Sequence, residues 1–284
     1  MRSFIASVFR IIFKISFLKK DYFGLYKRVF LPFNLFKGVT KDISYRNGIL
    51  LKLDLEDWIP QNIYFLNAYE EKEINFIEDF LKEGDCFIDV GANIGLFSLV
   101  ASKRVGSSGK VIAFEPFKRN YRILCNHILM NQASNVQSEN IAISNVSGKM
   151  RLHLNEKEKN FGMVSGVSNE HTYTEEAMTI CLDAYMETKI KSRVHLIKID
   201  IEGLEYQAIL GMLETIERHK PTLLIEINPI EKQPQNEKIE TLLFKMGYRK
   251  WFLDRWSKVT DKKEDGDCSN NYIFMMDNQD PTVL

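Results

Sequence analysis

Two segments of the sequence combine glycines and carboxylates at the ends of apolar runs. The first run reaches Asp89 and is followed by Gly91 and Gly95. The second run, residues 111–114, ends at Glu115, twenty residues after Gly95. Glycines after a buried strand let the backbone approach a ligand closely, and an acid ending the next strand can accept hydrogen bonds from ribose hydroxyls. The two segments together predict a binding site for a nucleoside.

The spacing of the two glycines indicates which nucleoside is expected. Three residues separate them, Ala92 and Asn93 among these, and no third glycine follows in the turn. The dinucleotide fingerprint G-x-G-x-x-G, which directs helix amides at a pyrophosphate, is therefore absent, and a nicotinamide oxidoreductase is disfavoured. Asp89 would repel a pyrophosphate but would suit an ammonium group. This pattern favours a methyl-donor pocket for S-adenosylmethionine, whose amino acid end carries such a group.

A second acidic cluster stands where the predicted strand 194–199 meets the helix that follows it. Asp200 and Glu202 come directly after this strand, and Glu205 begins the helix. Because the carboxyl ends of parallel strands meet at one edge of a sheet, Asp200 and Glu202 are expected to face the same crevice as the first cluster. Two carboxylates at the same crevice suggest acid–base chemistry. The alternative is that Glu202 or Glu205 caps the helix, since acids are favoured in a first turn.

Alternating patterns along the chain predict the elements that position these residues. Apolar runs of strand length alternate with helical periodicity from about residue 70 onward, which is typical of an α/β fold. We expect a mostly parallel, seven-stranded sheet with an antiparallel closing strand and helices on both faces. The predicted strands are 86–90, 110–115, 136–143, 194–199, 222–227, one near Trp251 and 272–276, with shorter extended segments at 149–154 and 179–182. The predicted helices are 70–82, 96–105, 120–130, 204–216 and 239–246.

Composition limits the remaining possibilities. A chain of 284 residues that is 45% hydrophobic can bury one sizeable core, with room for a small appendage. The four cysteines include no C-x-x-C pair, and the five histidines include no H-E-x-x-H motif, so no metal site is predicted and a reducing cytosol fits best. Residues 155–174 are rich in Gly, Ser, Asn and charge, which predicts a loop over the site that selects the acceptor.

The formal net charge of zero hides a basic N-terminal arm. Residues 1–41 carry a net charge of +8, so residues 42–284 carry −8, and we predict that the two are separate functional units. Within residues 4–18 eleven side chains are apolar, and a narrow polar stripe recurs at helical spacing. Such a helix is too short and too charged to span a bilayer, but it could dock on anionic lipid. The alternative is packing on the rest of the protein or on a partner subunit. Nucleic acid is disfavoured as the partner because residues 42–284 are acidic. We expect a cytoplasmic location, which allows peripheral contact with the inner face of the membrane.

Five segments in this order resemble the FkbM-type S-adenosylmethionine-dependent methyltransferases. They are the run FIDVGANIG, the pair Glu115–Pro116, residues 140–144, the KIDIEG run ending at Gly203, and residues 224–226. The resemblance covers residues 69–229, with a weaker similarity up to residue 276, and leaves the arm outside. It implies a class I methyltransferase (Rossmann-like) fold, S-adenosylmethionine as methyl donor, and O-methylation of a hydroxyl of a sugar, glycan or other secondary metabolite.

The resemblance also implies roles for individual residues. The methionine and ribose end of the donor would be held by Asp89, Gly91, Ala92, Asn93 and Gly95. Glu115 would hold the ribose diol, Asn140 and Ala142 at the end of the third strand would face the adenine, and Glu70 belongs to a tyrosine–glutamate pair that the family carries before its first strand. The alternatives are that the glycines only form a tight turn and that Asn140 only makes a turn.

The expected reaction is methyl transfer to an acceptor oxygen by in-line displacement. Asp200 or Glu202 is the candidate general base, and a divalent cation held by the same acids is the alternative. A non-catalytic nucleoside-binding or membrane-associated module with the same fold is the competing hypothesis. The sequence does not identify the acceptor or the oligomeric state.

Overall fold

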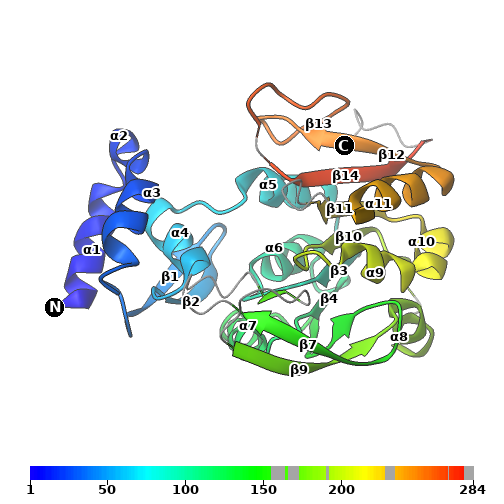
Figure 1. The fold of residues 1–284 in the computed structure, drawn as a ribbon, viewed down its shortest axis with the longest axis horizontal. Helices are drawn as coiled ribbons and strands as arrows, with labels where there is room; N and C mark the ends of the chain where they lie inside the picture. The colour runs from blue at the N-terminus through cyan, green and yellow to red at the C-terminus, as the bar shows by residue number, and fades with distance from the viewer. Residues whose placement is uncertain (155–163, 166–172, 190–191, 228–233, 268, 278–284) are drawn as a thin grey trace. The chain divides into compact units, whose positions relative to one another are not determined.

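The structure is a computed structural model, which describes residues 1–154, 164–165, 173–189, 192–227, 234–267 and 269–277. The chain divides into two compact units, built mainly from residues 1–70 and from residues 71 onward (Figure 1).

The C-terminal unit is organised around a sheet of eight described strands. Five parallel strands lie in the order β11, β10, β3, β4, β5. Beyond β11 the sheet continues with β14, β12 and β13, each pairing antiparallel with the strand before it, so β14 runs opposite to the parallel strands and β12 runs in their direction. The parallel strands are β3 (Cys86–Val90), β4 (Lys110–Phe114), β5 (Val136–Glu139), β10 (Leu196–Ile199) and β11 (Thr222–Glu226). The three strands with antiparallel pairings are β12 (Tyr248–Leu253), β13 (Val259–Thr260) and β14 (Asn271–Met276). The predicted mostly parallel sheet is confirmed, and the two-residue β13 adds an eighth strand to the seven expected.

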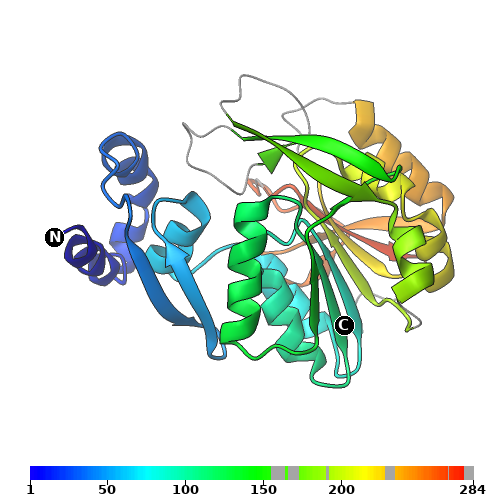
Figure 2. The ribbon, with the colours of Figure 1, turned by 90° about the horizontal axis from the view of Figure 1, so that it is seen from below.

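Helices cover both faces of this sheet, as predicted (Figure 2). One face carries α5 (Glu71–Phe80), α6 (Leu96–Val105) and α7 (Lys118–Met130), and the other carries α8 (Leu182–Lys189), α9 (Glu205–Leu210), α10 (Leu213–His219) and α11 (Pro234–Lys245). All residues of β3 and β10 are buried, which is why both strands read as continuous apolar runs rather than as alternating patterns. The chain reverses its direction of travel across the sheet between these two strands, and ligands bind at such a point in open α/β sheets.

The predicted strand 136–143 is wrong in extent, because its two ends form short strands in two different sheets. β5 ends at Glu139, and β6 (Ala142–Ile143) pairs in parallel with β9 (Tyr173–Ile180) in a separate four-stranded sheet. That sheet also contains β7 (Gly148–Leu154) and β8 (Val164–Ser165). Most of the predicted acceptor loop 155–174 lies outside the described residues.

The predicted helix 204–216 is two helices, α9 and α10, separated at Gly211. A Cβ on Gly211 would overlap the carbonyl oxygen of Ser144, so the chain approaches this neighbour too closely for any larger residue. The start of α10 is capped from another element, because the Asp183 carboxylate accepts hydrogen bonds from the backbone N–H groups of Glu214 (3.1 Å) and Thr215 (2.8 Å). The break therefore depends on tertiary contacts that helical periodicity does not report.

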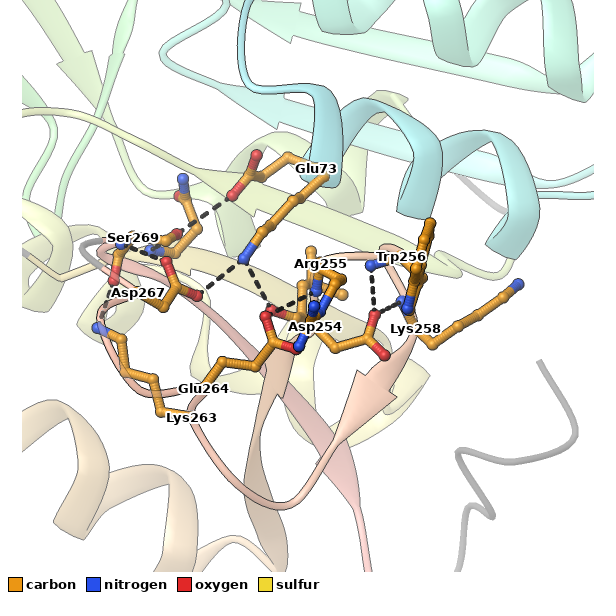
Figure 3. A network of polar contacts seen from close by, with 12 residues as sticks. Glu73, Asp254, Arg255, Trp256, Lys258, Lys263, Glu264, Asp267 and Ser269 are labelled. Carbon is orange, nitrogen blue, oxygen red and sulfur yellow. Dashed lines mark hydrogen bonds and ion pairs between the residues drawn. The ribbon is translucent and has the colours of Figure 1, made fainter.

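A polar network fastens α5 to the segment between β12 and β14 (Figure 3). Lys72 Nζ donates to the Asp267 carboxylate at 2.9 Å and to the Leu253 carbonyl at 3.3 Å. The Ser269 hydroxyl donates to Glu73 at 3.3 Å, and burial raises the pKa of this glutamate. The helix that leads into β3 is thus tied to the antiparallel edge of the sheet.

The N-terminal unit has its own aromatic core. Its elements are α1 (Arg2–Ile12), α2 (Ser16–Lys19), α3 (Tyr22–Leu25), the π-helical turn η1 (Tyr26–Phe30), β1 (Thr40–Tyr45), β2 (Ile49–Asp54) and α4 (Trp58–Leu66). The rings of Phe13, Tyr22, Phe30, Phe36 and Phe65 are buried and in mutual contact. The residues of the predicted arm 1–41 therefore pack with residues 42–70, and the compact unit extends beyond the boundary drawn at residue 41. No helix in the described part of the chain has the length and apolarity to cross a membrane.

Candidate active site

The predicted site residues gather at the carboxyl ends of the central parallel strands. Asp89 stands in β3 beside Ala113 of β4 on one side and Lys198 of β10 on the other. Glu115 follows β4 directly, and Asp200 follows β10. Adjacent parallel strands thus bring together side chains from residues 89 to 200 of the sequence.

The turn after β3 is built by close backbone contacts. Gly91 and Ala92 donate their N–H groups to the carbonyl of Phe114 at 3.0 and 2.9 Å. Gly91 has φ +86°, and a Cβ there would overlap the Asp200 carbonyl oxygen. Gly95 has φ +88° and lies against Leu124 of α7. The glycines therefore pack the turn against β10 and α7, as the tight-turn alternative supposed, and this packing places Asp200 beside the turn.

Glu115 is held by the backbone of this turn and of the following loop. One carboxylate oxygen accepts the Asn93 N–H at 2.7 Å, and the other accepts the Phe117 N–H at 2.8 Å. Burial raises the pKa of Glu115 to about 7; the two N–H groups oppose this shift, and the negative charges of Asp89 and Asp200 add to it. Each oxygen keeps a second lone-pair direction, so the carboxylate can still accept hydrogen bonds from a diol.

Asp89 is fully buried, and one of its oxygens has no hydrogen-bond partner among the described residues. Its other oxygen accepts the hydroxyl of Ser98 at 2.6 Å. Burial raises the pKa of Asp89, while Lys198 and Ser98 act in the opposite direction. An unpartnered buried oxygen is costly, and a bound ammonium group would satisfy it. The donor set therefore fits S-adenosylmethionine, because Asp89 would hold the ammonium group and Glu115 the ribose diol.

Lys198 supplies a buried positive charge among these acids. Its side chain is 2% exposed, and Nζ lies 2.8 Å from the Asp200 carboxylate and 4.6 Å from the centre of the Phe97 ring. Burial alone would raise the pKa of Asp200, but Lys198 and a hydrogen bond with Glu226 lower it below its ordinary value. Asp200 is therefore ionised at neutral pH.

Glu226 was missed by the sequence analysis. One carboxylate oxygen from each of Asp200, Glu202 and Glu226 lies within 4.8 Å of the other two, and all three residues are partly buried. The sequence carried the same pattern at this position. Glu226 is the last residue of β11, the parallel neighbour of β10, as Glu115 directly follows β4. These three carboxylates could act on an acceptor proton, or they could hold a divalent cation.

Glu205 stands in the first turn of α9, and its side chain holds the turn that precedes the helix rather than capping a helical N–H group. Its carboxylate accepts the Gly203 N–H at 3.0 Å and the Ile201 N–H at 3.3 Å at the start of α9. Glu202 does not stand within α9; it lies in the preceding turn with φ +52°. The structure thus separates these two acids, with Glu202 in the carboxylate cluster and Glu205 at the helix end.

Asn140 directly follows β5, at the end of the third parallel strand as predicted, whereas Ala142 lies in β6 of the second sheet, contrary to the prediction. The Asn140 amide donates to the carbonyls of Glu115 (2.8 Å) and Pro116 (2.9 Å), so it positions the loop that carries Glu115. Ala142 is buried in β6 of the second sheet. Contact of either residue with an adenine stays a prediction. Glu70 is the last residue of the N-terminal unit, with φ +43°, and its predicted role also stays a prediction.

The strand order and the acids at the strand ends together define a class of protein. A mostly parallel sheet in which β14, inserted between β11 and β12, runs opposite to the other long strands, with a glycine turn after β3 and an acid after β4, is the architecture of class I methyltransferases. The methyltransferase FkbM domain matches residues 89–250 of the chain. The protein belongs to the FkbM methyltransferase family. This membership confirms the predicted family, the fold class and S-adenosylmethionine as the cofactor.

Several solved structures are similar to the chain at low sequence identity. The methyltransferase FkbM from Methylobacillus flagellatus KT is 16% identical with a TM-score of 0.45, over 76% of this chain and 52% of that protein, so the chain spans about half its length. An S-adenosylmethionine-dependent O-methyltransferase from Thermotoga maritima is 12% identical (TM-score 0.42), over 84% of this chain and 87% of that one. Fibrillarin from Aeropyrum pernix, solved with S-adenosylmethionine bound, is 13% identical (TM-score 0.42), over 69% and 67%. No curated protein sequence matches the chain significantly.

Proposed function

We propose that the protein transfers a methyl group to a hydroxyl of a sugar, a glycan or another secondary metabolite. The observation that carries this proposal is the meeting of two sets of carboxylates at one edge of the sheet. Asp89 and Glu115 suit the two polar ends of the donor, and Asp200, Glu202 and Glu226 stand together at the ends of the adjoining strands β10 and β11. A donor pocket beside a group of acids is what methylation of a weakly nucleophilic oxygen requires.

The bound S-adenosylmethionine would supply a methyl group that the acceptor oxygen takes by in-line displacement, leaving the electron pair on sulfur. The buried charges of the chain orient both reactants. Such positioning can contribute about 7–11 kcal/mol to lowering the barrier. Loss of the donor residues is therefore expected to cost more activity than loss of a base.

The acidic cluster would remove the acceptor proton. Lys198 holds Asp200 ionised and therefore able to accept a proton, but the lowered pKa makes Asp200 a weaker base than a carboxylate that titrates near neutral pH. Glu202, whose carboxylate belongs to the same cluster, is the second candidate base. Proton transfer by such a group contributes about 10²–10⁴-fold in rate.

The first experiment is calorimetry of the full chain with S-adenosylmethionine and S-adenosylhomocysteine. Micromolar binding of both, lost in Glu115→Ala and absent for NADH as control ligand, would support the transferase and justify a screen of hydroxylated acceptors with radiolabelled donor. A folded protein that binds neither ligand would contradict the proposal and favour the non-catalytic module. Donor binding without methyl transfer to any glycan or sugar-lipid in the screen would contradict the acceptor class only.

A further inference from the structure

Helix α1 carries apolar side chains on two opposite faces. One face, with Ala6, Phe9 and the following Phe13, contacts the aromatic core of the N-terminal unit. The other face carries Phe4 and Ile11, which are 73% and 66% exposed, and Val8 lies between them at 39%. A helix of a globular protein ordinarily turns charged residues outward, so this outward apolar face requires an explanation.

Exposed apolar side chains continue past the end of α1. Ile15, in the extended backbone between α1 and α2, is 56% exposed, and Phe17 in α2 is 73% exposed. We call the set Phe4, Val8, Ile11, Ile15 and Phe17 the outer apolar stripe. Single exposed apolar residues are common on proteins, but five such residues within fourteen positions of the sequence are a dense group, and dense exposed apolar groups mark interaction surfaces.

Contacts on the polar side of α1 fix which face is turned outward. The Arg10 guanidinium stacks on the Tyr64 ring, 4.6 Å from its centre. Lys41 Nζ donates to the Ser7 hydroxyl at 2.9 Å. These contacts, together with the buried ring of Phe13, leave the outer apolar stripe as the exposed side of a helix whose rotation is determined.

The charged residues of the segment that carries the stripe are all of one sign up to Lys20, and the exposed Asp21 follows directly. The first twenty residues contain five basic side chains and no acidic one. Lys14, Lys19 and Lys20 are exposed and lie beside Ile15 and Phe17 in the sequence. A basic border around an apolar patch complements a surface that is apolar inside and anionic at its edge, which is the chemistry of an anionic lipid leaflet. A second copy of the same patch would present positive charge to positive charge.

We propose that α1 and α2 lie in the interface of an anionic membrane, with the outer apolar stripe among the acyl chains and Lys14, Lys19 and Lys20 at the headgroups. An eleven-residue helix is about 17 Å long, roughly half of what a span requires, so it lies along the surface. The inference is independent of the proposed function, but the two together would bring a methyltransferase to acceptors that are themselves anchored in a membrane.

The test is co-sedimentation of the full chain with phosphatidylcholine vesicles, with and without phosphatidylglycerol. We expect binding to the anionic vesicles that weakens with salt, and much weaker binding to the neutral ones. Replacing Lys14 and Lys19 by Gln is expected to weaken binding about 25-fold, because each basic residue near the surface contributes about 1 kcal/mol, or roughly fivefold. Phe4→Ser with Ile11→Ser should also abolish most binding.

Matched controls keep the test decisive. Leu129→Ser removes an equally exposed apolar side chain, 76% exposed on α7 of the C-terminal unit, and should leave lipid binding unchanged. Binding of S-adenosylhomocysteine by every variant checks that the fold is intact and separates this test from that of the proposed function. Absence of binding to anionic vesicles, equal binding to neutral ones, or full binding by both stripe and lysine variants would overturn the proposal. A dimer in light scattering that Ile11→Ser dissolves would assign the stripe to a second copy instead.

Discussion

The protonation of Glu115 is expected to control donor binding near neutral pH. Burial raises the pKa of this carboxyl to about 7, and Asp89 and Asp200 add to the shift. With a pKa of about 7, roughly one molecule in eleven carries the ionised form at pH 6 and about ten in eleven carry it at pH 8. A ribose diol donates its hydrogen bonds to a carboxylate, so the binding-competent fraction follows the ionised form. The apparent Kd of S-adenosylhomocysteine should therefore fall about tenfold from pH 6 to pH 8.

Calorimetry at half-unit pH steps measures this directly. Titrations at pH 7 in two buffers of different ionisation enthalpy should show release of about half a proton on binding, because the ligand selects the ionised form. Glu115→Gln is the matched control, since it keeps the size of the side chain and removes its titration. The variant should bind more weakly at pH 8 and show a flatter profile; any remaining slope would report Asp89, whose pKa burial also raises, or the ligand itself.

Two results would refute the reasoning. A wild-type Kd that is constant between pH 6 and pH 8 would show that Glu115 does not titrate there or does not contact the ligand. An equal tenfold slope in Glu115→Gln would assign the titration to another group.

Further predictions concern the turn, the stability of the fold and the acids. Gly91→Ala should lower the free energy of unfolding by about 2–5 kcal/mol in urea titrations and abolish donor binding, because the new Cβ adds overlap with Asp200 to the strain of a positive φ. The control Gly266→Ala, at φ +80° with open space around it, should lower the free energy of unfolding by only about 1–2 kcal/mol. The raised pKa of Glu115 favours its protonated form in the folded state, so its contribution to the free energy of folding should fall by about 3 kcal/mol as the pH rises from about 4.5 through 7. Over that range the free energy of unfolding of Glu115→Gln should rise relative to the wild type. A difference between the two proteins that stays constant with pH would contradict this prediction. Glu202→Gln should lower kcat by about 10²–10⁴-fold while donor affinity stays within a few-fold, and unchanged turnover would remove Glu202 from the mechanism. Asp200→Asn should in addition destabilise the fold by about 3 kcal/mol, since the buried Lys198 loses its ion partner. Activity should survive excess EDTA; loss that Mg²⁺ restores would transfer the activating role to a cation held by the carboxylate cluster.

Much of the central fold followed from local patterns. The predicted strand 86–90 and helix 96–105 coincide with β3 and α6, because a buried run between turn residues and a helix that ends at a glycine are signals carried by the segment itself. The assignment of Asp89, Glu115 and Asp200 to one edge of the sheet also needed only the rule that parallel strands end together. Local patterns were less reliable for helix ends in the arm, since the helix predicted over residues 4–18 ends as α1 at Ile12.

The sequence by itself determined the order of strands and helices, the glycine turn, and which acids end which strand, since periodicity and turn residues act over a few positions. Only the tertiary structure decided that β5 and β6 belong to different sheets, that Gly211 divides a helix against Ser144, that Glu226 joins Asp200 and Glu202, and that one face of α1 is left exposed. Each of these depends on which distant residue arrives within a few ångströms, and hydrophobic pattern alone is compatible with more than one such partner.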